Sequence, residues 1–243
     1  MIKKENQSVI GENTPRSDGF AKVTGKLEYP SDIHIPGMLY AAVLRSPYPH
    51  AEILSIDTSE AEAMGAVCLT YKDIKPIIYN ERSVSVPSQT YRDRTILPNK
   101  ARHVGEPIAA VAAETEELAF KAVKALKVEY KILEAVFDPE EAMKDGAPQL
   151  YDTIYLGDEA VKVHNNIGVI RNINEGDCDA GFAQADRIFE RDFELGRIYH
   201  AQLETKNAVC KPEPDGTLTV WATAQSIHGT RQMLARALNM PLS

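Results

Sequence analysis

The stretch GEPIAAVAAETEELAFKAVKALKVEYKI, residues 105–132, decides how this chain folds. Residues 108–113 are a short run of small apolar side chains, which favours a strand covered on both faces. Thr115 then offers a helix N-cap, and apolar side chains recur at helical spacing over residues 118–126. Residues 128–132 alternate between apolar and polar, as in a half-buried strand. Strand, helix and strand with short connections predict an α/β layer unit.

The chain on the N-terminal side of this unit adds further strands. Residues 38–45 are an apolar run bounded by a glycine and a proline, and their length favours a buried strand. Two more strands are expected at residues 53–56 and 67–70. A short helix between them has Asp57 or Thr58 as its candidate N-cap.

Three stretches rich in turn-forming residues flank or separate these elements. The first 37 residues predict an irregular N-terminal arm, and residues 75–100, with three prolines, predict a long surface loop. A short helix is expected at residues 139–143, and residues 146–165 are interpreted as a linker.

Strands and helices are expected again beyond the linker. Strands are predicted near residues 167–173 and around Phe189, Phe193 and Leu195, with a helix capped by Asp177 between them.

The last part of the chain has a turn signal followed by a helical pattern. Residues 214–217 read Pro-Asp-Gly-Thr, which predicts a hairpin with a type I′ turn. Residues 218–222 would be the returning strand, and residues 227–238 predict an amphipathic helix that ends at Asn239.

Composition excludes several classes of protein. Of the 243 residues, 44% are hydrophobic and 26% charged, which is typical of a well-packed globular protein. The net charge is -8 and no basic stretch stands out, so we expect neither a nucleic acid nor a membrane as partner. No secretory signal or long apolar stretch is evident, and the expected location is the cytoplasm.

Residues that could carry chemistry are few. The three cysteines Cys68, Cys178 and Cys210 and the six scattered histidines show no metal-ligand spacing, and no phosphate-binding loop is present. We therefore predict no metal ligand and no catalytic residue on this chain.

Three polar residues are the candidate ligand-binding positions. Glu204 follows His200 closely, where a strand is expected to end, and could orient a polar ligand; a surface acid or salt bridge is the alternative. Gln225 lies at a strand-to-helix turn, where backbone N–H groups can face an anion, and a plain loop role is the alternative.

A series of short motifs resembles the molybdenum-binding large subunit of the xanthine dehydrogenase and aldehyde oxidase family. Each motif is weak alone, but their common order makes the resemblance strong. In chain order they include Lys22-Val23-Thr24-Gly25-Lys26, Pro36-Gly37-Met38-Leu39-Tyr40, Arg45-Ser46-Pro47-Tyr48-Pro49-His50-Ala51, Val104-Gly105-Glu106-Pro107-Ile108, Gly176-Asp177, Leu203-Glu204 and Trp221-Ala222-Thr223-Ala224-Gln225.

The resemblance implies a fold of the α/β (α+β) class. After the irregular arm of residues 1–37, it implies an α/β-hammerhead domain at 38–145 and a linker at 146–165. Residues 166–243 would be the beginning of a first, incomplete molybdopterin-binding domain of mixed α/β structure.

The resemblance also implies an activity. Members of this family hydroxylate a heterocycle or an aldehyde at molybdenum held by molybdopterin, take the oxygen from water, and pass electrons through [2Fe-2S] clusters, usually to FAD. The implied partners are the remainder of the molybdenum-binding subunit, an iron–sulfur subunit and an FAD subunit.

The resemblance assigns no catalytic residue to this chain. The family's Gly-rich loop, pocket arginine and catalytic glutamate have no counterpart here, so the chain alone is expected to be inactive and to bind no cofactor by itself. Three residues would at best contact the groups that bind the cofactor, and not the cofactor itself: His200, Glu204 and Gln225. Ile198 stands where several relatives carry a glutamine near the metal.

Two other functions stay open. The first is a non-catalytic assembly or interaction module that kept the hammerhead fold. The second is a small-molecule binding protein. Apolar surface left uncovered predicts either self-association as a homo-oligomer or a poorly ordered tail beyond residue 165.

Overall fold

The computed structural model describes residue 11 and residues 13–80, 91–170 and 172–242. The chain forms two compact units, neither of which is continuous in sequence. One unit comprises residues 1–36 and 199–224, and the other comprises residues 37–198 and 225–243. The predicted division into consecutive parts does not anticipate this pairing of distant segments.

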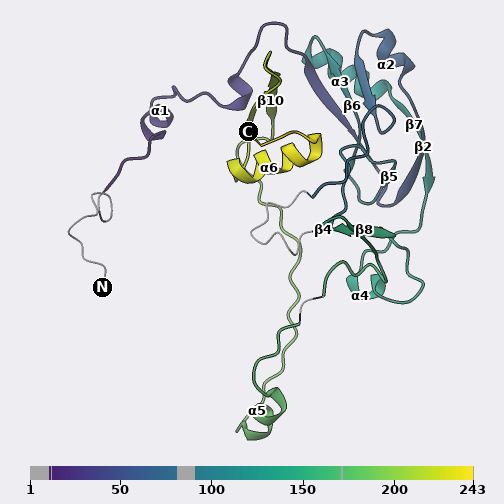
Figure 1. Ribbon diagram of the computed structural model, residues 1–243, viewed down its shortest axis with the longest axis vertical. Coiled ribbons are helices and arrows are strands. Elements are labelled where there is room, and N and C mark those ends of the chain that lie inside the picture. The colour runs from purple at the N-terminus through teal and green to yellow at the C-terminus, as the bar shows by residue number, and fades with distance from the viewer. Residues whose placement is uncertain (1–10, 12, 81–90, 171, 243) are drawn as a thin grey trace. The chain divides into compact units, whose positions relative to one another are not determined.

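The larger unit is built around a three-stranded antiparallel sheet with β6 at its centre (Figure 1). Strand β6 (Pro107–Ala113) pairs with β1 (Tyr40–Arg45) on one side and with β3 (Val67–Thr70) on the other. Since both flanking strands pair with β6, its backbone hydrogen bonds are satisfied on both edges. The predicted strand at 67–70 is confirmed.

Two helices close one face of this sheet. Helix α3 (Glu116–Ala125) packs on β1 and β6, and α2 (Ser59–Ala63) packs beside α3. The predicted N-cap is confirmed, since the Thr115 side chain accepts a hydrogen bond from the Leu118 N–H. The side chains that α3 buries lie at the predicted helical spacing. The core residues are Ala42, Ala61, Ala66, Ala109, Val111, Ala113, Ala119, Ala122, Val123 and Leu126.

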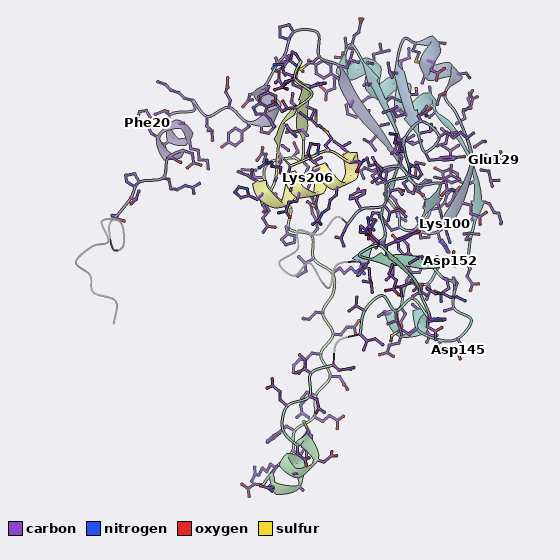
Figure 2. All side chains as sticks on the ribbon, in the orientation of Figure 1. Phe20, Lys100, Glu129, Asp145, Asp152 and Lys206 are labelled. Carbon is purple, nitrogen blue, oxygen red and sulfur yellow. The ribbon has the colours of Figure 1, made fainter. Side chains whose placement is uncertain are left out.

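A second antiparallel sheet has the order β5–β2–β7, and its exposed surface is charged. It consists of β5 (Lys100–Ala101), β2 (Ala51–Asp57) and β7 (Lys127–Ile132). Lys131 pairs with Glu52 at 3.1 Å, and Ser55 Oγ donates to Glu129 Oε2 at 3.2 Å. Figure 2 labels Glu129 on this sheet. These cross-strand pairs stabilise a sheet surface that faces solvent.

The stretch interpreted as a linker contains a hairpin, so that interpretation is wrong. Strands β8 (Thr153–Leu156) and β9 (Glu159–Lys162) pair with each other, and β4 (Tyr91–Arg92) pairs with β8. Residues 75–100 are likewise more ordered than a plain loop, since they include β4 and the start of β5; residues 81–90 lie outside the described part.

Three predicted helices of the larger unit are confirmed. They are α4 (Pro139–Ala142), α5 (Cys178–Gln184) and α6 (Ile227–Leu238). Asp177 caps α5 by accepting from the Ala180 N–H at 2.9 Å, as predicted. Asn239 ends α6 in the left-handed conformation, with φ 53°.

Two predicted strands are absent from the described residues. Neither residues 167–170 and 172–173 nor the stretch around Phe189, Phe193 and Leu195 belongs to a strand. The alternation of side chains is present in the sequence, but no neighbouring strand of the described chain pairs with it.

The smaller unit contains a hairpin of β10 (Ala208–Pro212) and β11 (Leu218–Ala222), together with α1 (Gly19–Val23) and the 3-10 turn η2 (Pro30–Asp32). The hairpin is confirmed but its predicted type I′ turn is wrong. Such a turn needs positive φ at two residues, and here only Gly216 has it, at 86°. Asp215 Oδ1 instead accepts from the Thr217 N–H at 2.9 Å.

Candidate functional site

Glu204 is held at the open end of the β10–β11 hairpin. Thr223, which follows β11, donates its hydroxyl to Glu204 Oε1 at 3.1 Å. The Thr223 N–H donates to the Asn207 carbonyl at 3.1 Å, which continues the ladder beyond the strands. Glu204 lies four positions before Ala208, where β10 begins, and no strand precedes it in residues 185–203, so the expectation that it ends a strand is wrong.

A buried acceptor lies beside this pair. Asn207 Oδ1 is buried and has no hydrogen-bond partner among the described residues. Asn207 directly follows Lys206 in the chain, and Figure 2 labels Lys206 at this end of the hairpin. Asn207 contacts Thr223 through its backbone carbonyl and Glu204 does so through its carboxylate, so both residues lie at this end of the hairpin. A buried acceptor without a donor is costly, and an N–H or O–H group of a ligand or water would satisfy it.

The other two candidate residues are not fixed in the same way. His200 belongs to the same unit as Glu204 and is exposed, next to Ala201, whose φ of 49° is positive. Gln225 is exposed and belongs to the other unit. It lies between β11 and α6 in the chain, as predicted, but Ser226 rather than Gln225 caps α6, accepting from the Gly229 N–H at 3.2 Å.

The opposite end of the hairpin offers a matched comparison for Glu204. Glu213 also accepts from a threonine hydroxyl, since Thr219 Oγ1 donates to its Oε1 at 3.0 Å. Lys211 lies 2.8 Å from Glu213 Oε2, and lowers the pKa of that carboxyl by hydrogen bonding to it. Glu213 is thus neutralised by a neighbour, whereas Thr223 is the only side chain that donates to Glu204 among the described residues.

Glu106, in the larger unit, is the most deeply buried carboxylate among the described residues. Its residue is 4% exposed, and its Oε2 accepts from the Arg102 N–H at 2.5 Å. Arg94 Nη1 lies 3.7 Å from its Oε1. Arg102 in turn stacks over the Tyr151 ring at 4.4 Å and donates to the Leu150 carbonyl. This network joins the start of β6 to the chain preceding β8, which is a structural role.

The sequence patterns did not single out this network. In the sequence, Glu106 was identified only as part of a motif that precedes an apolar strand. An acid at the entrance to a buried strand is a weak signal that it is itself buried and paired.

Burial within this network raises the pKa of Tyr151 to about 12. An unfolded tyrosine titrates near pH 10, so above that pH the unfolded chain loses a proton that the folded chain keeps. Stability should therefore fall by about 1–2 kcal/mol between roughly pH 10 and pH 12, after allowing for solvent screening. Tyr151→Phe should flatten this part of the stability profile in urea unfolding. An unchanged slope would show that Tyr151 titrates as freely as an exposed tyrosine.

His50 makes a structural contact between distant parts of the chain. Its Nδ1 lies 2.6 Å from the Glu134 carbonyl, and only a protonated Nδ1 can donate there. Its Nε2 is buried without a partner in the described part of the chain. His50 thereby ties the start of β2 to the chain that follows β7.

Within the described ranges, no group of three or more histidine, cysteine, aspartate or glutamate side chains could hold a metal ion. The hairpin end at Glu204 and Asn207 has side-chain acceptors instead, which could bind an organic group that carries N–H or O–H donors. No helix in the described residues is long and apolar enough to cross a membrane.

Two family models match the chain in succession. Residues 24–134 match the a/b hammerhead domain of aldehyde oxidase and xanthine dehydrogenase, and residues 161–243 match a molybdopterin cofactor-binding domain. The α/β class and the family expected from the motif series are therefore confirmed.

Curated relatives give the same assignment. The chain is 40% identical over 228 residues to a probable xanthine dehydrogenase subunit of Bacillus subtilis, covering 93% of this chain and 28% of the relative. It is 32% identical to the nicotinate dehydrogenase large molybdopterin subunit of Eubacterium barkeri, covering 98% of this chain and 53% of that subunit. The chain thus spans between about a quarter and a half of these relatives.

Solved structures of the same kind share the fold. A Cu,Mo-CO dehydrogenase matches with a TM-score of 0.79 and 28% identity, covering 96% of this chain and 30% of that one. The aldehyde oxidoreductase of Desulfovibrio gigas matches with a TM-score of 0.77 and 27% identity, over 94% of this chain and 25% of that one.

Proposed function

Because the chain belongs to the aldehyde oxidase and xanthine dehydrogenase family, we propose that it works as part of a molybdenum hydroxylase. The complete enzyme would hydroxylate a heterocycle or an aldehyde with oxygen from water. The observation that carries this proposal is the succession of two matched domains, hammerhead then molybdopterin-binding, in one chain.

The proposed enzyme needs groups beyond this chain. We propose that molybdenum is held by molybdopterin, and that [2Fe-2S] clusters and FAD lie on partner subunits. Molybdopterin would supply the metal centre at which the substrate is oxidised. Alone, the chain should be inactive, and its location in the cytoplasm stays a prediction.

We propose that Glu204 and Asn207 accept hydrogen bonds from the organic part of the cofactor, with His200 nearby in the same unit. The support is that Glu204 accepts from the Thr223 hydroxyl, the Asn207 carbonyl accepts from the Thr223 N–H, and Asn207 Oδ1 is buried without a partner among the described residues. That Gln225 contacts the residues that bind the cofactor, and not the cofactor itself, stays a prediction.

Glu204→Gln in the assembled enzyme should lower molybdenum content roughly tenfold, which is the usual effect of removing a group that supports a metal site from outside. The substitution keeps the shape of the side chain and removes its charge. Molybdenum per protein, measured by elemental analysis, checks this directly.

The control is Glu213→Gln, at the other end of the same hairpin. Its carboxylate also accepts from a threonine hydroxyl, at 3.0 Å against 3.1 Å for Glu204. Molybdenum content should stay at the wild-type level. Equal losses in both variants would mean that the hairpin matters only for folding.

The reaction itself is tested by isotope labelling. The complex purified from its host would be supplied with candidate heterocycles and aldehydes and an artificial electron acceptor in water enriched in oxygen-18. Hydroxylated product should carry the heavy oxygen. Product labelled only from dioxygen, or no product with any substrate of either class, would contradict the proposal.

The alternative of a non-catalytic assembly module rests on one observation, the large apolar side chains left exposed between residues 167 and 203. Such a module would copurify with partners and yet leave their activity unchanged when removed. Loss of hydroxylase activity on deletion of the chain separates the two functions.

A further inference from the structure

Residues 200–206 carry two of the candidate residues and have little structure of their own. They belong to no helix or strand, and each of them is exposed. Within the described part of the chain they make two hydrogen bonds, and the Thr223 hydroxyl is the donor of both. One goes to Glu204 Oε1 at 3.1 Å and the other to the Thr205 carbonyl at 3.3 Å. Among the described residues, Thr223 is therefore the hydrogen-bonding anchor of this segment.

The backbone of Thr223 holds this anchor in place. Thr223 directly follows β11, and its N–H donates to the Asn207 carbonyl at 3.1 Å, which extends the β10–β11 ladder by one step. Its side chain is half-buried, whereas Glu204 is exposed. The hydroxyl thus joins an ordered hairpin end to a segment that has no backbone ladder of its own.

The hydroxyl has one proton for two acceptors. A threonine hydroxyl donates one hydrogen bond at a time, so it engages either the Glu204 carboxylate or the Thr205 carbonyl. A donor on a ligand can therefore take Glu204 Oε1 while the segment stays attached through the Thr205 carbonyl. The arrangement holds the carboxylate at the hairpin end without blocking it.

We propose that Thr223 is a positioning residue, whose hydroxyl fixes residues 200–206 and thereby orients Glu204 toward the organic part of the cofactor. This role rests on the proposed function, because Glu204 is the residue that would contact the ligand. The anchoring itself rests only on the hydrogen bonds named above. Groups that orient a ligand-binding side chain typically change metal affinity or activity by about tenfold or more.

The anchoring is tested on the full chain without cofactor. Lys206 follows the two anchored residues, and a protease that cleaves only after lysine needs the chain around it to loosen. Thr223→Val removes the hydroxyl and keeps both the branched side chain and the N–H that bonds to Asn207. Cleavage after Lys206, followed by mass spectrometry, should become roughly two- to tenfold faster, as expected for the loss of one hydrogen bond. Unchanged cleavage would overturn the proposal.

Thr219→Val is the matched control at the other end of the hairpin. Thr219 Oγ1 donates to Glu213 Oε1 at 3.0 Å, which resembles the contact between Thr223 and Glu204. Cleavage after Lys206 should keep its wild-type rate in this variant. Equal acceleration in both variants would show a general loosening of the hairpin and would also overturn the proposal.

The link to the cofactor is tested by the molybdenum content of the assembled enzyme. Thr223→Val should lower it about tenfold, whereas Thr223→Ser, which keeps the hydroxyl, should leave it at the wild-type level. Thr223→Val combined with Glu204→Gln should lose no more than either change alone, because the two residues act as one unit. A threonine that acted independently of Glu204 would give the product of the two losses, about a hundredfold.

Failure of the positioning role and failure of the cofactor contact look different. The positioning role is wrong if Glu204→Gln lowers molybdenum and Thr223→Val does not, if Thr223→Ser is as poor as Thr223→Val, or if the two losses multiply. If Glu204→Gln itself keeps its molybdenum, the cofactor contact proposed for Glu204 fails, and the role of Thr223 fails with it. Oxygen labelling tests the hydroxylase activity separately.

Discussion

Ile108→Ala should lower the free energy of unfolding of the larger unit by about 3–4 kcal/mol. Ile108 lies on the central strand β6 and is fully buried, at 0% exposed. The substitution removes three carbon atoms from a packed site and leaves a cavity that the sheet, paired on both edges, closes only in part. Urea unfolding followed by circular dichroism measures the loss.

Ile132→Ala is the matched control, since it deletes the same atoms from the end of β7. Ile132 is 62% exposed, so the expected loss is below about 1 kcal/mol. Comparable losses in the two variants would contradict the placement of the core around β6.

Glu106→Ala should lower the free energy of unfolding by about 3 kcal/mol. The carboxylate accepts from the Arg102 N–H and faces Arg94. Its removal leaves a buried amide without that acceptor and takes one carboxylate away from the Arg94 guanidinium. Glu106→Gln, which keeps an acceptor, should lose less. Chemical unfolding of both variants at neutral pH measures the difference.

The control for Glu106 is an exposed ion pair. Glu52 lies 3.1 Å from Lys131, which is closer than the 3.7 Å between Glu106 and Arg94. The side chains of Glu52 and Lys131, however, both face solvent. Glu52→Ala should therefore change stability by less than about 1 kcal/mol. If Glu52→Ala proved the more harmful, burial would not govern the strength of these pairs.

Local patterns in the sequence predicted the elements that are stabilised by their own neighbours. Thr115 and Asp177 cap their helices as expected, and α6 spans the predicted residues 227–238. Each of these signals acts within a few residues, so it can be read without knowing the rest of the fold.

Elements that depend on distant partners could not be predicted in the same way. The alternation around Phe189 and Leu195 has the period of a strand, but a strand also needs a neighbour, which the described chain does not supply. Conversely, the β8–β9 hairpin was interpreted as linker; β8 also pairs with β4, which links residues more than 60 positions apart.

The candidate site was predicted in part. Glu204 was singled out from its neighbours in the sequence, but its contact with Thr223 joins residues on either side of a hairpin whose geometry the sequence only outlines. Asn207, the buried acceptor, carried no signal at all, because burial of one side-chain atom is a property of the packed structure.

The most direct test of the central claim is purification of this chain from its native host, with metal analysis of everything that accompanies it. We predict that molybdenum and iron copurify at near-stoichiometric levels together with other polypeptides that complete the hydroxylase. Recovery of the chain alone and free of both metals would contradict its role as a working part of such an enzyme.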